Sequence, residues 1–183
     1  MAKKSGGKNK VGIIGYVMFA LVIISFVMVI VSMFIGQVSV TRTSEVLKTT
    51  ETTTYKLFDS DFWGVETVLG KEVGVSNAFG IAAVIITLVG AFVLAVDGVL
   101  RVFLKKKFKI IPIIAGLITL VGAVLILAAG LSMAGSCEDY LGIDAGKAVK
   151  VTCSAAAGVW IGFVFGLVAA AIGILSAVLK KSK

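Results

Sequence analysis

The stretch IIPIIAGLITLVGAVLILAAGLSM, from Ile110 to Met133, contains no charged residue. A helix of this length measures about 36 Å, which is enough to cross about 30 Å of hydrocarbon. An amphipathic helix of a soluble protein would also show a polar face, and this stretch shows none. The sequence therefore predicts a transmembrane helix at residues 110–133.

Three more apolar blocks predict spans at residues 11–36, 78–100 and 155–179. Apolar residues make up 58% of the chain and charged residues 15%, against about half and a quarter in soluble domains. The first block follows four lysines, as the core of a signal peptide would. It is too long for such a core, and no small-residue cleavage site closes it. We expect an all-α membrane protein built as a four-helix transmembrane bundle.

The distribution of charge predicts the topology. The remaining segments are the tail 1–10, loop 1 at 37–77, a basic loop at 101–109, loop 2 at 134–154 and the tail 180–183. The two tails and the basic loop hold twelve cations and no acid, whereas loops 1 and 2 hold six cations and nine acids. Cytoplasmic segments are the cation-rich ones, so we expect both termini in the cytoplasm and loops 1 and 2 outside. The net charge of +8 is then a consequence of topology, and we expect no nucleic-acid partner.

Loop 1 is rich in residues that favour β-structure, in the runs VSVTRTS and VLKTTETTTYKLF. These runs predict a small extracellular antiparallel β-sheet of two or three short strands, formed mainly by loop 1. A competing interpretation is that the tract Thr49–Thr54 carries O-linked glycans.

Two cysteines, Cys137 and Cys153, fall in loop 2. In an oxidising compartment they are placed to form a disulfide, which would stabilise a loop of this size by about 3 kcal/mol. In a reducing compartment they would be free thiols. The chain contains no histidine, which excludes histidine-based metal sites and catalytic triads. We expect no metal, no cofactor and no catalytic residue, and hence a protein that is not an enzyme.

Small residues recur every fourth position in the last span, at Gly158, Gly162, Gly166 and Ala170. This spacing places them on one helix face, where the absence of side chains lets another helix approach closely. The second span has a weaker version at Ala83, Thr87, Ala91 and Ala95. The pattern predicts tight helix packing, either within the bundle or between copies of the chain.

Charged residues flank the second span. Asp97 lies four residues before Arg101, so an ion pair at the end of the helix is expected, while a role in proton or ion movement is the alternative. The basic loop carries Lys105, Lys106, Lys107 and Lys109. These lysines could bind anionic lipid headgroups, although determination of topology accounts for them equally. The lipid bilayer is thus the first expected partner.

The C-terminal residues KKSK resemble a cytosolic dilysine retrieval signal of the endoplasmic reticulum. Basic residues after a last span are common, and we therefore expect the plasma membrane, with the endoplasmic reticulum or another endomembrane as the alternative.

Several features together resemble the claudin-like tetraspan superfamily. They are the four spans, the cytoplasmic termini, the long first outer loop, the motif Phe62-Trp63-Gly64 and the second-span sequence NAFGIAAVIITLVGAFVLAVDGVL. The nearest resemblance is to the amastins, surface proteins of kinetoplastid parasites, and it includes Gly158 and the stretch Trp160–Gly166. Both groups carry a cysteine pair in loop 1, which this loop lacks. For Trp63, a position at the membrane interface is an equal alternative.

The resemblance implies a structural, adhesion or complex-organising role at a membrane surface, as a homo-oligomer or with a membrane-protein partner. The alternative is an oligomeric pore or channel subunit, or an auxiliary subunit of a channel or membrane complex. Against a pore, the spans contain few polar residues that could line one, chiefly Ser25, Ser32 and Thr119.

Overall fold

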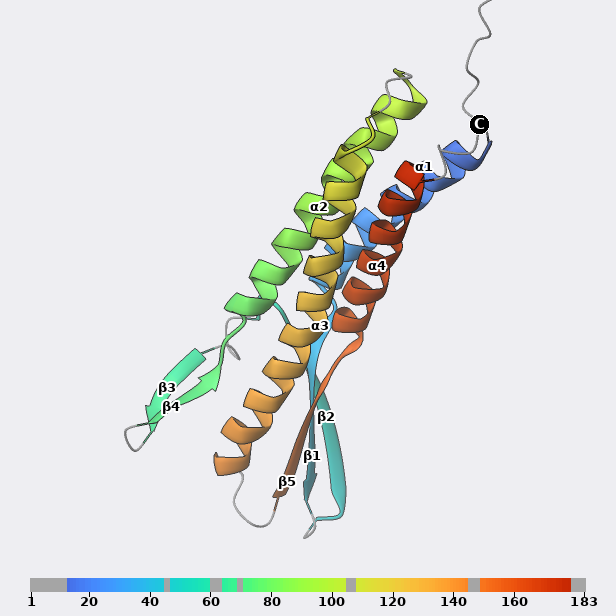
Figure 1. The fold of residues 1–183 in the computed structure, drawn as a ribbon. Coiled ribbons are helices and arrows are strands. Elements are labelled where there is room, and N and C mark those ends of the chain that lie inside the picture. Colours follow the sequence, from blue (N-terminus) through green and yellow to red (C-terminus); the bar gives the residue numbers. More distant parts are fainter. Residues whose placement is uncertain are drawn as a thin grey trace, which may run out of the picture.

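The computed structural model describes residues 13–44, 47–59, 64–68, 71–104, 108–144 and 149–178. The helices are α1 (Ile13–Ser32), α2 (Ala78–Val102), α3 (Ile111–Asp144) and α4 (Ala157–Val178), and the strands are β1 (Gly36–Ser44), β2 (Thr49–Lys56), β3 (Gly64–Val68), β4 (Lys71–Val75) and β5 (Val149–Ala155) (Figure 1). Phe62, Trp63 and Lys105–Lys107 lie outside the described residues. Gly64 is the first residue of β3.

All four helices are long and apolar enough to cross a membrane. They pack in a ring, since α1 contacts α2 and α4, and α3 contacts α2 and α4. The start of α1, the end of α2, the start of α3 and the end of α4 lie at one end of the bundle, and the strands lie at the other (Figure 1). The three segments predicted to be rich in cations thus adjoin the same end, which we call the basic end. The other is the sheet end.

Large apolar side chains cover the outside of the bundle, and small residues fill its inside. Val89 and Phe92 of α2 are about half exposed, whereas Ala83 and Ala91 of the same helix are fully buried. In lipid there is little hydrophobic drive between helices, so close backbone packing through small residues holds the bundle together. The exposed apolar side chains form the surface that lipid would contact.

Helix α3 does not end at residue 133, as the sequence analysis expected, but continues to Asp144. Its 34 residues span about 51 Å, which exceeds the hydrocarbon thickness by about 20 Å. The extension keeps one face buried beyond the apolar stretch, through Met133, Ala134 and Cys137. Hydropathy predicts where a helix leaves the hydrocarbon and not where the helix ends. The prediction of residues 134–154 as a loop was therefore wrong for most of that segment.

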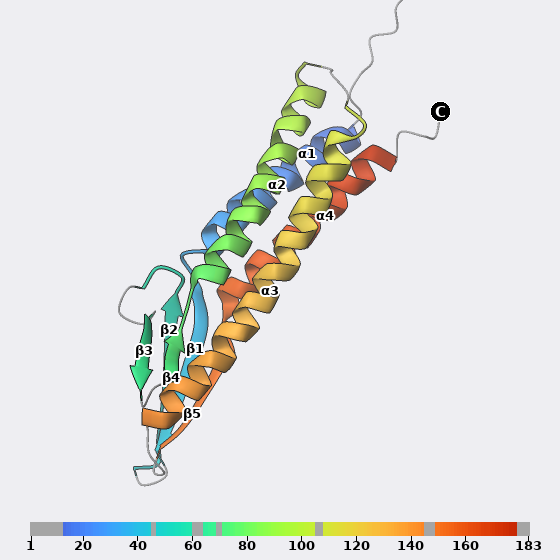
Figure 2. The ribbon, with the colours of Figure 1, turned by 60° about the vertical axis from the view of Figure 1, so that its left-hand side comes forward.

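Loop 1 supplies β1, β2, β3 and β4, and the second connection supplies β5, which the sequence analysis did not predict. Three strands form an antiparallel sheet in the order β2-β1-β5, so the long β1 is central, and β3 pairs with β4 in a separate hairpin (Figure 2). The inner face of the sheet packs on α3, where Val38 and Val40 join Met133 and Cys137 in one core cluster. The sheet is therefore seated on the projecting end of α3.

Candidate functional site

The sheet unit, which we define as β1, β2, β5 and the end of α3 beneath them, is anchored by a disulfide. The structure joins Cys137 of α3 to Cys153 of β5, with the two Cα atoms 6.1 Å apart. Both cysteines are buried in the core cluster between the sheet and the helix. The predicted pairing is confirmed, but the pair links a helix to a strand instead of closing a loop. The consequence is a sheet held rigidly against a helix that continues into the bundle.

Loss of this disulfide is expected to destabilise the sheet unit. The two cysteines are 16 residues apart, and a cross-link of this span is worth about 3 kcal/mol in the chain-entropy model. We expect the double variant Cys137→Ala/Cys153→Ala to lose about this much unfolding free energy. Relative to the wild type, its amide exchange should accelerate more in β5 than in α2. Reductant should reproduce the effect in the wild type and leave the double variant unchanged. A wild type that is indifferent to reductant would contradict the prediction.

The outer face of the sheet is lined by hydroxyl groups. Because Val38 and Val40 face α3, the alternate residues of β1 point away from it, and residues paired across strands share a face. The outward positions are Ser39, Thr41 and Thr43 of β1, Thr50, Thr52 and Thr54 of β2, and Lys150, Thr152 and Ser154 of β5. Eight of these nine side chains are hydroxyls, and the hydroxyl oxygens of Thr41 and Thr52 lie 3.3 Å apart. We call this surface the hydroxyl face.

Strand β2 forms an open edge of the sheet. Every residue of β2 except Tyr55 is exposed. Apart from β1, no described helix or strand makes an extensive contact with β2. An edge strand presents unpaired backbone N–H and C=O groups on its free side. The sheet unit therefore offers two polar surfaces, the hydroxyl face and this edge.

The small-residue ridge of α4 packs inside the bundle. A β-carbon at Gly158 would lie 2.8 Å from the carbonyl oxygen of Ser32, at the end of α1. At Gly166 it would lie 2.7 Å from the β-carbon of Ala123 on α3, and at Gly162 it would lie 3.0 Å from the Ser32 hydroxyl. Ala170 is buried on the same face. The ridge thus contacts α1 and α3 of its own chain.

The closest helix contact was missed in the sequence analysis, although the sequence carries a signal for it. The hexapeptide ITLVGA occurs twice, at 86–91 in α2 and at 118–123 in α3. In the antiparallel helix pair the two copies meet reciprocally, so that Thr87 lies against Gly122 and Thr119 lies against Gly90. Each threonine hydroxyl donates a 2.8 Å hydrogen bond to the carbonyl four residues earlier in its own helix. This crossing has approximate two-fold symmetry, with a threonine and a glycine of each helix at the contact.

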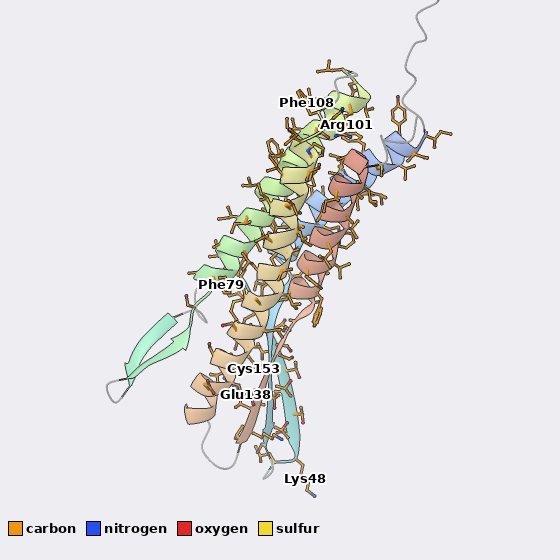
Figure 3. The ribbon with its side chains drawn as sticks, in the orientation of Figure 1. Lys48, Phe79, Arg101, Phe108, Glu138 and Cys153 are labelled. Atoms are coloured by element: carbon orange, nitrogen blue, oxygen red, sulfur yellow. A yellow bond between two sulfur atoms is a disulfide. The ribbon has the colours of Figure 1, made fainter. Side chains whose placement is uncertain are left out.

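Arg101 connects several segments at the basic end of the bundle through an ion pair and two hydrogen bonds. Its Nε lies 2.5 Å from the Asp97 carboxylate, as the i,i+4 spacing predicts. The other two guanidinium nitrogens donate to backbone carbonyls, that of Ser176 in α4 at 3.1 Å and that of Phe108 at 2.9 Å. Figure 3 shows Arg101 and Phe108 close together at this end. One side chain thus connects α2, α4 and the segment that leads into α3. Lys109, the described lysine of the basic loop, is exposed.

Searches against protein-family models and against curated proteins found no match for this chain. Among the described residues, no group of three or more histidine, cysteine, aspartate or glutamate side chains could hold a metal ion. Among the described residues, the sheet unit presents two polar surfaces that another molecule could contact.

Proposed function

We propose that this chain is a non-enzymatic four-span membrane protein that presents the sheet unit to a partner and so serves in adhesion or in organising a membrane complex. The observation that carries the proposal is the polar sheet seated on the end of α3, a helix about 20 Å longer than the thickness of the hydrocarbon. The core cluster and the Cys137–Cys153 disulfide make this unit rigid. A rigid surface loses little conformational entropy when it binds.

We place the sheet unit outside the cell and both termini in the cytoplasm, at the plasma membrane. The charge asymmetry of the sequence supports this orientation. A disulfide in the sheet unit supports an oxidising compartment on that side. The endomembrane alternative keeps the same topology with the sheet in the lumen. The resemblance to claudins and amastins, in the order of spans and loops, agrees with a role at a membrane surface.

The alternative function, an oligomeric pore or an auxiliary subunit, requires contacts through the helices. The exposed side chains of α2 are apolar, among them Ile85, Val89, Phe92 and Val96. The threonines of α2 and α3 are buried and bonded to their own helices. A water-filled path between copies would need polar groups on the outer surface of the helices, so we rank the pore second. Helix-mediated association with a partner subunit needs no such groups.

Photo-cross-linking separates these functions. A benzophenone side chain would be placed at exposed sheet positions Thr50 or Thr152, or at exposed helix positions Val89 or Val164, and irradiated in native membranes. We expect protein adducts from the sheet positions and lipid adducts from the helix positions. Protein adducts from the helix positions alone would overturn the proposal and favour a pore or auxiliary subunit.

A further inference from the structure

The edge of β2 that no described strand covers lacks the protection that edge strands commonly have. Soluble sheets shield such edges with proline, bulges, central charges or very short strands. Strand β2 is eight residues long, contains no proline, and has only Glu51 as a charge before its last residue, Lys56. Its one irregularity in pairing with β1 lies at the Gly36 end. The strand is rich in threonine, which favours extended structure. This edge is therefore competent to pair with another strand.

The composition of β2 indicates which kind of strand would pair with it. A sheet edge that recruits a foreign peptide obtains specificity from pockets for alternate side chains. Tyr55 packs on the core cluster, but Thr49–Thr54 are exposed, and β1 is the only described helix or strand in extensive contact with β2. Within the described residues, this part of the edge therefore offers backbone groups and threonines and no such pocket. An identical strand matches both features, since Thr–Thr pairs are favourable across strands. From these observations, and on the basis of the proposed function, we infer that β2 pairs with β2 of a second copy of this chain.

The direction of the strand indicates where that copy lies. In Figures 1 and 2, β1, β2 and β5 extend from the sheet end roughly along the long axis of the bundle. Lys48, which directly precedes β2, lies at the far tip (Figure 3). Antiparallel pairing of two identical strands about a two-fold axis turns one bundle by 180° relative to the other. The two bundles then stand at opposite ends of the joined sheet, so the paired copies belong to two facing membranes.

Such a pair avoids repulsion between like charges. Side chains alternate between the two faces along a strand, and residues paired across strands share a face. When two identical strands pair about a two-fold axis perpendicular to the sheet, the two residue numbers of each pair therefore add up to an even number. The register with the axis at Thr53 avoids such repulsion, because Glu51 then lies opposite Tyr55 of the second copy and Lys56 opposite Thr50. An axis at Thr52 would instead place Lys56 opposite Lys48. Overlap along the eight residues of β2 sets the distance between the two membranes at about 30 Å, close to the length of the sheet.

Vesicle tethering tests the inference. Full-length protein would be reconstituted into two populations of phosphatidylcholine vesicles with different dyes, and co-diffusion would be measured by fluorescence cross-correlation. We expect tethering only when both populations carry the protein, with a membrane gap near 30 Å in electron micrographs. Capture of protein-free vesicles would overturn the inference, as would a gap near 60 Å, which would indicate contact between tips.

Two matched variants test the edge itself. Thr52 and Thr152 lie on opposite sides of Thr41 in one row of the hydroxyl face, and both are exposed. Thr52→Lys adds a charge to the β2 edge, and we expect at least a tenfold loss of tethering. Thr152→Lys adds the same charge to β5, and tethering should stay within twofold of the wild type. Thermal unfolding of both variants would verify that the sheet is intact.

Three further outcomes would overturn the pairing. Equal tethering by the two variants would remove β2 from the contact. Glycans found by mass spectrometry on Thr49–Thr54 of the native protein would close the edge. Absence of tethering together with protein adducts at Thr152 would refute pairing and leave the proposed function intact, because the sheet would then bind a different protein.

Discussion

Gly122→Ala is expected to destabilise the bundle by about 3 kcal/mol, the upper part of the usual range for overpacking a core. A β-carbon at this position would lie 2.6 Å from the backbone nitrogen of Thr87 and 2.8 Å from its Cα. Backbone atoms of a packed helix cannot rotate away, so α2 and α3 would have to separate. The same holds at Gly90, where a β-carbon would lie 2.7 Å from the backbone nitrogen of Thr119. Thermal unfolding in detergent would measure the loss.

Two other glycines of α3 provide controls. At Gly130 the three atoms nearest to a β-carbon all belong to the side chain of Val159, so Val159→Ala should relieve part of the cost of Gly130→Ala. Thr87→Ala should relieve Gly122→Ala less, because it removes the Thr87 hydroxyl and leaves the backbone nitrogen and Cα of Thr87 in place. At Gly135 no atom lies within 4 Å, and alanine should stabilise the exposed helix by about 0.5–1 kcal/mol. Equal effects at Gly122 and Gly135 would show that α2 and α3 do not approach closely in the membrane.

The bundle was predictable from the sequence because hydropathy is a local property. Each span follows from its own residues, and the predicted spans agree with α1, α2 and α4 to within a few residues. The last eleven residues of α3 are helical for a different reason, because β1 and β5 cover their apolar face. These strands come from segments far away along the chain. The helical extension therefore could not be predicted from residues 134–144 alone.

The sheet unit was predictable only in part. The runs of loop 1 predicted strands, whereas β5 was missed because the segment after Met133 was treated as one short loop. A signal was present, since Val149, Val151, Cys153 and Ala155 alternate with polar residues as a half-buried strand requires. The repeated ITLVGA hexapeptide was a further signal for the α2–α3 crossing. That the two copies would meet with Thr against Gly depends on helix register, which the sequence does not state.

Arg101→Ala is expected to cost about 3 kcal/mol, although the residue lies at the end of the bundle. Asp97 is 4% exposed, and removing one member of a buried ion pair leaves a charge whose desolvation is no longer offset by that pairing. The variant also removes the two hydrogen bonds to Ser176 and Phe108, which hold α4 and the start of α3 to α2. Unfolding free energy and amide exchange at the ends of the helices would measure both effects.

Further variants separate the effect of the buried charge from the effect of the hydrogen bonds that the Arg101 guanidinium donates. Asp97→Asn combined with Arg101→Ala should recover about half of the loss, because the buried charge is gone while the carbonyls of Ser176 and Phe108 stay without their donor. Arg101→Lys keeps the charge but cannot reach three acceptors at once, since an ammonium on a flexible stem lacks the planar fork. The Arg101→Lys variant should therefore keep most of the unfolding free energy and show faster amide exchange than the wild type at the end of α4. Rescue by the double variant would establish a structural role for Asp97. If Asp97→Asn alone left stability unchanged and abolished an ion current, the pore alternative would replace the adhesion proposal.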